Sequence, residues 1–146
     1  MATRSYIGVQ MPNGSIEAVY CHFDGYPRGV GHTLHTYHNS LQAAATILEL
    51  GDLSYLAEKL APEPGQVHKF GNAVGGVTVA YMRDRGETGL EARTFPDVKT
   101  FTQAAKDSWA EFIYLFRDGA WFYSPVPEKE EPVWNPCFTV AEFLFA

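Results

Sequence analysis

Two turn dipeptides, each flanked by apolar runs, constrain the fold of this chain more than any other feature of its sequence. Asn13-Gly14 separates the first two runs, and Asp118-Gly119 separates the last two. Both dipeptides tolerate the positive φ angles that a tight turn between antiparallel strands requires. The sequence therefore predicts one β-hairpin near each end of the chain. The four runs are SYIGVQM (5–11), IEAVYCH (16–22), EFIYLF (111–116) and AWFYS (120–124).

Capping residues and apolar spacing predict helices between the hairpins. A short helix around Leu34 should end near residue 39, and Ser40, Asp52 and Asp97 are suitable N-caps for three more. The three capped helices are expected at 41–50, 53–60 and 98–109, the last with Trp109 facing inward. The apolar VTVAYMR (77–83) and LEARTF (90–95) are predicted strands, and Thr139 with Glu142 has the spacing of a capping box for a terminal helical turn.

This order of elements predicts an α+β fold. Strands that join mainly through hairpins form a largely antiparallel sheet, and we expect the helices to pack on one face of it. The length of 146 residues and the absence of an internal repeat or linker indicate a single domain over residues 1–146.

Composition excludes several classes of function. The net charge is −6, with no cluster of Lys and Arg, so bulk charge will not bind duplex nucleic acid. Cys21 and Cys137 lack the spacing of a zinc knuckle or disulfide framework, and we expect reduced thiols. No apolar window is long enough to span a membrane, and the N-terminus lacks a signal peptide's apolar run. We therefore expect a cytoplasmic protein that does not associate with membranes.

The segment YCHFDGYPRGVGHTLHTYH (20–38) concentrates the chemistry-bearing residues. It is not a nucleotide-binding P-loop, because the second glycine of that motif, counted from Gly25, falls on Val30, one residue before Gly31. His32 follows Gly31 where the motif's lysine should stand. His32, His35 and His38 follow one another at i, i+3 and i+6, a spacing that drifts around a helix instead of converging on a metal ion. We expect no metal site and no cofactor.

A strand end and a constrained turn bring four polar residues together within this segment. His22 and Asp24 are candidates for general acid–base work, and Tyr26 and Arg28 are suited to a ligand's ring and its phosphate or carboxylate. The alternative is a turn stabilised by its own polar groups. Backbone amides at Gly29 and Gly31 could favour an anion, or these glycines could only allow the chain to turn.

Two further stretches have competing interpretations. Arg83 and Arg85 end a predicted strand and suit an anionic ligand, but they also fit an ordinary charge-balanced turn. The aromatic run 112–123 resembles a stacking platform for bases, although core packing or contact with a second copy is more typical of such hairpins. The Pro- and Gly-rich segment 61–76 is a long loop, and such loops are usually functional or mobile.

Residues 5–38 resemble the start of a group of small bacteriophage and prophage proteins with a Tyr-Cys-His-Trp/Phe-Asp-Gly-Tyr-Pro segment. The stretches LGDLSYL (50–56), VAYMRDRGE (79–87) and EFIYLFRDGAWFY (111–123) also resemble this group. The resemblance implies phage or prophage origin and an accessory role in the infected cell, often against host defence. It transfers no catalytic residue.

We therefore expect a binding protein and a homo-oligomer that captures a nucleotide-like anion or a host protein. The residues expected at this site are His22, Asp24, Tyr26, Arg28, Gly29, Gly31, Arg83 and Arg85. Two alternatives stay open: a phosphoester or nucleotide hydrolase that uses His22 and Asp24, and a module that binds only proteins.

Overall fold

The two predicted hairpins form the centre of the computed structural model, which describes residues 2–139. Strands β1 (Ser5–Gln10) and β2 (Ile16–Cys21) pair antiparallel around a turn in which Gly14 has a φ of 88°. Strands β6 (Phe112–Arg117) and β7 (Ala120–Pro125) pair in the same way around Asp118 and Gly119, both with positive φ. Both hairpin predictions are therefore confirmed.

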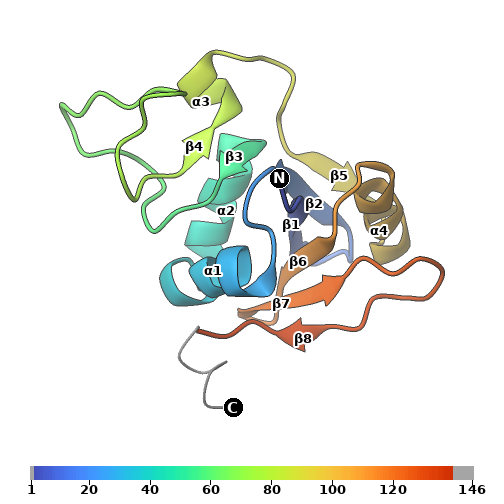
Figure 1. Cartoon of the computed structure of the whole chain (residues 1–146). Helices are drawn as coiled ribbons and strands as arrows, with labels where there is room; N and C mark the ends of the chain where they lie inside the picture. The colour runs from blue at the N-terminus through green and yellow to red at the C-terminus, as the bar shows by residue number, and fades with distance from the viewer. Residues whose placement is uncertain (1, 140–146) are drawn as a thin grey trace.

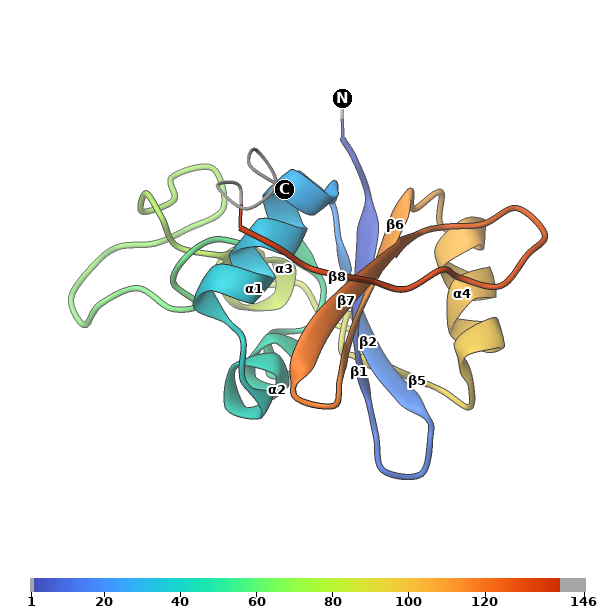
Figure 2. The ribbon, with the colours of Figure 1, turned by 90° about the horizontal axis from the view of Figure 1, so that it is seen from below.

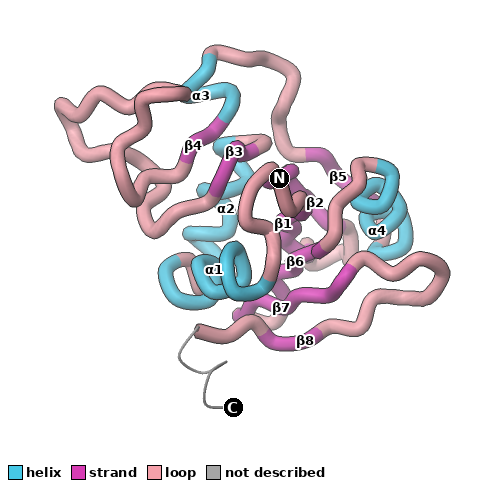
Figure 3. The backbone as a smooth tube through the Cα atoms, in the orientation of Figure 1, coloured by secondary structure: helices cyan, strands magenta, loops and turns pink. Residues whose placement is uncertain are grey.

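The remaining elements are short, as Figure 3 shows. They are the π-helical turn η1 (Pro27–Gly31), α1 (His32–Tyr37), α2 (Leu41–Leu50), β3 (Leu53–Tyr55), β4 (Val79–Ala80), α3 (Tyr81–Arg85), β5 (Arg93–Phe95), α4 (Val98–Asp107) and β8 (Asn135–Pro136). The predicted caps of α2 and α4 are confirmed, because Ser40 Oγ accepts from Ala43 N and Asp97 Oδ1 accepts from Thr100 N.

Strands β1 to β8 belong to one sheet, and seven of them follow the order β4-β3-β2-β1-β6-β7-β8 (Figure 1). The outer edge of β2 is shared by two strands, with β3 beside Cys21 and β5 beside Ile16–Ala18. Among the strand pairs formed within residues 2–139, only β1–β6 and β2–β3 are parallel. The predicted α+β class and mostly antiparallel sheet are confirmed.

The helices cover both faces of the sheet rather than the single face we expected. Figures 1 and 2 show α1 and α2 on one side of the central strands and α4 on the other. One core contains Ile7 with Leu34 and Ile47, and the other contains Tyr6 with Phe101. The reason lies in β1 and β2, whose alternate side chains are apolar on both faces and therefore need cover on both sides.

The helix predicted at 53–60 is wrong, because the segment begins with strand β3. Asp52 does not cap a helix. Its carboxylate accepts a hydrogen bond from Tyr20 N at 2.9 Å and a bidentate pair of hydrogen bonds from Arg93. Leu53 then pairs in parallel with Cys21, which buries it in the core under α2. Long-range partners outweighed the local helical pattern here.

Two other predictions fail because the chain turns earlier than its apolar pattern indicates. The strand predicted at 77–83 is reduced to β4, because the chain turns into α3 where Asp84 Oδ2 accepts from Ala80 N. Trp109 lies beyond the end of α4 with a φ of 62°, and 79% of its surface is exposed. The helical turn predicted from Thr139 and Glu142 lies outside the described residues.

Candidate functional site

The loop between β2 and η1 is held by hydrogen bonds to two other parts of the chain. Gly25 N donates to Thr3 O at 2.8 Å, and the buried Tyr114 hydroxyl donates to Gly25 O at 2.6 Å. A Cβ atom at position 25 would lie 2.7 Å from Thr3 O, so only glycine permits this approach. The start of the candidate site is therefore fixed to the N-terminal segment and to β6.

The second half of the loop closes on itself. Val30 N donates to Asp24 O, and Gly29 N donates to Tyr26 O, each at 2.9 Å. A Cβ atom at position 29 would lie 2.4 Å from Asp24 O. Gly29 therefore serves close backbone packing, and its amide already has an acceptor within the loop.

Gly31 is buried and lies against the ring of Tyr114, where an added Cβ would meet Cε1 at 3.2 Å. Its lack of a side chain lets the end of η1 pack on β6. The glycines that could have cradled an anion thus have structural roles that explain them.

His22 and Asp24 are engaged by different partners. His22 Nδ1 lies 2.7 Å from the Tyr20 hydroxyl, and its ring packs edge-on against Phe23. Asp24 Oδ1 accepts a weaker hydrogen bond from the Tyr26 hydroxyl at 3.3 Å. The geometry therefore forms a Tyr20–His22 pair in place of the His22–Asp24 pair that the hydrolase hypothesis needs.

The pKa values of His22 and Tyr26 are shifted in opposite directions by their surroundings. Burial, and secondarily the positive charge of Arg4, lowers the pKa of His22 and favours its neutral form. The Asp24 carboxylate raises the pKa of Tyr26, which therefore keeps its hydroxyl proton. Tyr20 and Arg4 are residues of this site that sequence analysis missed. Tyr20 lies two positions before His22 and therefore on the same side of the extended chain, whereas Arg4 is brought near by the antiparallel pairing of β1 with β2.

Three large rings on this segment are exposed although the backbone beneath them is fixed. The exposed fractions are 40% for Phe23, 42% for Tyr26 and 47% for Tyr37. The Arg28 side chain is also exposed, close enough to act electrostatically on Tyr26. In this part of the site, exposed side chains project from a backbone that hydrogen bonds and close glycine packing hold in place.

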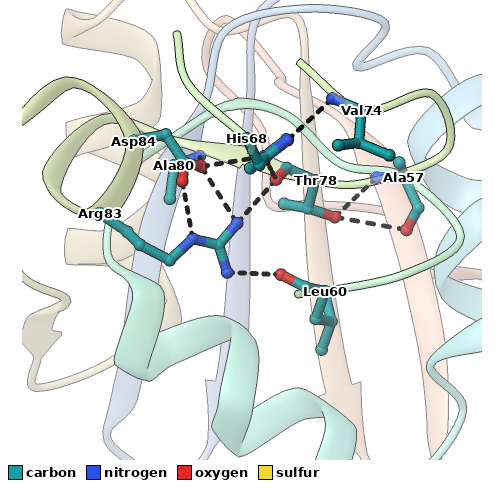
Figure 4. Close-up of polar contacts among 8 residues, drawn as sticks. All are labelled: Ala57, Leu60, His68, Val74, Thr78, Ala80, Arg83 and Asp84. Atoms are coloured by element: carbon teal, nitrogen blue, oxygen red, sulfur yellow. Dashed lines mark hydrogen bonds and ion pairs between the residues drawn. The ribbon is translucent and has the colours of Figure 1, made fainter. Parts of the chain in front are cut away.

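Arg83 and Arg85 belong to a different cluster, shown in part in Figure 4. The Arg83 guanidinium donates to the Asp84 carboxylate and to the backbone oxygens of Leu60 and Thr78, at 2.7–3.0 Å. Arg85 stacks over Phe70 and Tyr81 and forms an ion pair with Glu87. Both arginines are therefore engaged by the protein itself, as the charge-balanced interpretation expects.

His68, the one histidine outside the 20–38 segment, organises this second cluster. Its side chain is 1% exposed; Nε2 donates to Thr78 O, and Nδ1 accepts from Val74 N, both at 3.0 Å. An imidazole that accepts at one nitrogen and donates at the other is neutral. His68 thereby anchors the 61–76 loop, a role that no local sequence pattern marked.

The Asp84 carboxylate lies beside His68, with 3.4 Å between Oδ2 and Nε2. Burial opposes its charge, but hydrogen bonds from Arg83 and Ala80 N outweigh burial and lower the pKa of Asp84. The polar contacts therefore connect the segment at Leu60, the 61–76 loop, the start of β4 and helix α3. They are made by Arg83, Asp84, His68 and Thr78. We call these four residues the loop anchor.

The other candidate groups are dispersed. His38 is buried and donates from Nε2 to Ala57 O at 2.8 Å, whereas His32 contacts Thr36 and the Tyr37 ring. Within residues 2–139, no three His, Cys, Asp or Glu side chains are grouped so as to hold a metal ion.

The two cysteines are free and buried, and burial raises the pKa of each to about 12, which disfavours a thiolate nucleophile. The C-terminal aromatic run contributes core packing, since Tyr114, Phe116 and Trp121 are buried.

A cavity lies away from residues 22–38, which comprise the turn after β2 together with η1 and α1 and are called the 22–38 loop below. It has a volume of about 820 Å³ and lies between α2 and the turns of the two hairpins. None of the candidate residues predicted from sequence lines it. The candidate loop and this groove are therefore separate features.

Comparisons with known proteins identify no relative of this chain. No protein-family model, curated protein or solved structure is significantly similar to it. In the part of the chain that the structure describes, no helix is long and apolar enough to cross a membrane.

Proposed function

We propose that this protein is a phage or prophage accessory protein that binds a host protein through the loop at 22–38, in the cytoplasm of the infected cell. One observation carries the proposal: Phe23, Tyr26 and Tyr37 expose their rings from a backbone fixed by hydrogen bonds and glycine packing. None of the three rings belongs to either core, and rings on a fixed backbone lose little entropy when a partner covers them.

The same geometry favours a macromolecular partner over a nucleotide-like ligand. The candidate side chains project from the loop, and the Gly29 amide is already engaged by Tyr26 O. Arg28 and Asp24 add charges of opposite sign beside the rings, an arrangement typical of a protein interface with an aromatic centre and a charged rim.

Site-specific photocrosslinking tests this proposal. A photoreactive phenylalanine analogue at position 26 should yield a discrete crosslinked product in bacterial cells. The same analogue at Val67, which is 65% exposed on another loop, should not yield it. Excess unlabelled protein should suppress the product, whereas excess of a Phe23→Ser/Arg28→Glu variant should not.

Equal products from positions 26 and 67, or equal competition by the double variant, would contradict a role for the loop. A thermal-shift screen against mono- and cyclic nucleotides tests the alternative that the loop binds a nucleotide-like ligand instead of a host protein. Stabilisation that Arg28→Ala abolishes would replace the host protein with a nucleotide-like ligand as the bound species.

A further inference from the structure

A groove lies at the opposite end of the β1–β2 hairpin from the 22–38 loop. Its walls are helix α2, the end of β1 with the turn that follows it, and the β6–β7 turn at Asp118. The volume of about 820 Å³ is within the range of ligand-binding clefts. A smaller hollow of about 330 Å³ at the N-terminal end of α2 adjoins it and shares Gln10, Leu41, Arg117 and Asp118 with it.

The inner surface of the groove is apolar. Val9 and Leu48 form part of it where they join the core, and Met11 and Ala92 lie partly buried beside them. Leu41, on the exposed wall, keeps 65% of its surface exposed. An amphipathic occupant could therefore bury apolar side chains against an existing surface.

The charges available at this groove are negative. Glu17 lies on the sheet face that α2 covers, because it pairs with the buried Val9, and Glu49 and Asp118 complete the acidic rim. No ion pair among residues 2–139 engages these three carboxylates.

The one cation among the lining residues is directed elsewhere. The guanidinium of Arg117 stacks over Phe122 at 4.8 Å and lies 5.7 Å from the Trp134 ring. Trp134 packs on the core under α4, which is on the opposite face of the sheet from α2. The groove therefore presents apolar surface and unpaired negative charge together.

We propose that this groove binds a cationic amphipathic peptide segment, in which apolar side chains are flanked by Lys or Arg. The apolar residues would cover Val9, Leu41 and Leu48, and the cations would meet Glu17 and Glu49. This is the helix-in-groove mode of recognition, with charge complementarity supplying orientation and selectivity. The site is distinct from the 22–38 loop and does not depend on its proposed partner.

Fluorescence anisotropy with a designed probe tests this inference. The probe is a labelled peptide of Leu and Lys, about four helical turns long, with its Leu residues on one face. We expect saturable binding by the whole protein. Glu17→Gln/Glu49→Gln should weaken it roughly tenfold, since each exposed pair contributes modestly. Ala45→Lys, which places a cation on the exposed wall, should weaken it at least as much.

Matched controls separate this site from bulk charge. Glu58→Gln/Glu130→Gln raises the net charge by the same two units away from the groove and should leave binding unchanged. A Phe23→Ser/Tyr26→Ser variant should also bind normally. Equal losses in both Glu-to-Gln pairs, equal binding of a scrambled Leu–Lys peptide, or full binding by Ala45→Lys would overturn the proposal.

Discussion

At the scale of single residues, glycines and buried hydrogen-bonding groups set the conformation of the 22–38 loop. Gly25 meets Thr3 O and receives the Tyr114 hydroxyl, and Gly29 meets Asp24 O. These contacts explain why a segment rich in exposed aromatic rings keeps one conformation. Among the polar residues of this segment, His22 pairs with the Tyr20 hydroxyl, and Asp24 accepts from the Tyr26 hydroxyl.

Replacing Gly25 tests this account. Gly25→Ala should lower the free energy of unfolding by about 2 kcal/mol or more, because the new methyl group would lie 2.7 Å from Thr3 O. Urea titration followed by tryptophan fluorescence measures the loss. Gly75→Ala is the matched control, since a Cβ there meets nothing within 4 Å; a comparable loss in both variants would refute the explanation.

At the scale of elements, one polar cluster holds a long segment in place where strand or helix hydrogen bonds are few. Figure 3 shows a long loop segment between β3 and β4. It is held by the loop anchor, in which His68 and Asp84 have side chains 1% and 3% exposed. A buried charge-assisted network of this kind is costly to break when one member is removed.

Removing the charge of Asp84 should therefore release the loop. Asp84→Asn is expected to cost about 2–4 kcal/mol in the free energy of unfolding and to speed tryptic cleavage after Lys69. Gel electrophoresis of timed digests measures the cleavage rate. Asp107→Asn, on the far face of the sheet, serves as control, and unchanged cleavage in Asp84→Asn would contradict the anchor.

The Asp84 carboxylate also makes the stability of the fold depend on pH, with stability lost as the pH falls. Because folding lowers the pKa of Asp84 from its ordinary value of 3.8, its ionised form stabilises the folded state. That contribution is complete above about pH 3.8 and is lost as the pH falls through the lowered pKa. The stability difference between wild type and Asp84→Asn should therefore shrink as the pH falls below 3.8, and a constant difference would contradict this linkage.

At the scale of the whole molecule, the central strands are apolar on both faces and separate two cores. Ile47 from α2 lies in one core, and Phe101 from α4 lies in the other. Gly8 in β1 lets the Phe101 ring pack closely on the sheet, because a Cβ at position 8 would lie 3.2 Å from that ring. The exposed 22–38 loop and the acidic groove then occupy opposite ends of the β1–β2 hairpin.

This architecture predicts independent contributions from the two covering helices. Ile47→Ala and Phe101→Ala should each lower the free energy of unfolding by about 3–4 kcal/mol. Because a sheet separates the two side chains, the double variant's loss should equal the sum within about 0.5 kcal/mol. Thermal or urea unfolding of the three variants measures this, and strong coupling would indicate one shared core.

The sequence by itself determined the elements whose signals are local. Asn13-Gly14 and Asp118-Gly119 set both hairpins, and Ser40 and Asp97 set the starts of two helices. These signals depend on φ preferences and on hydrogen bonds between residues close in the chain, so neighbouring residues suffice to predict them.

Only the tertiary structure decided the features that depend on distant partners. The Asp52 carboxylate accepts hydrogen bonds from Arg93 and Tyr20 N instead of capping a helix. His68 holds the 61–76 loop through hydrogen bonds with Thr78 O and Val74 N. The pairing of β1 with β6 placed Tyr114 under Gly25 and fixed the 22–38 loop. Burial makes each of these polar contacts decisive, because a buried polar group must find its partner wherever the fold supplies one.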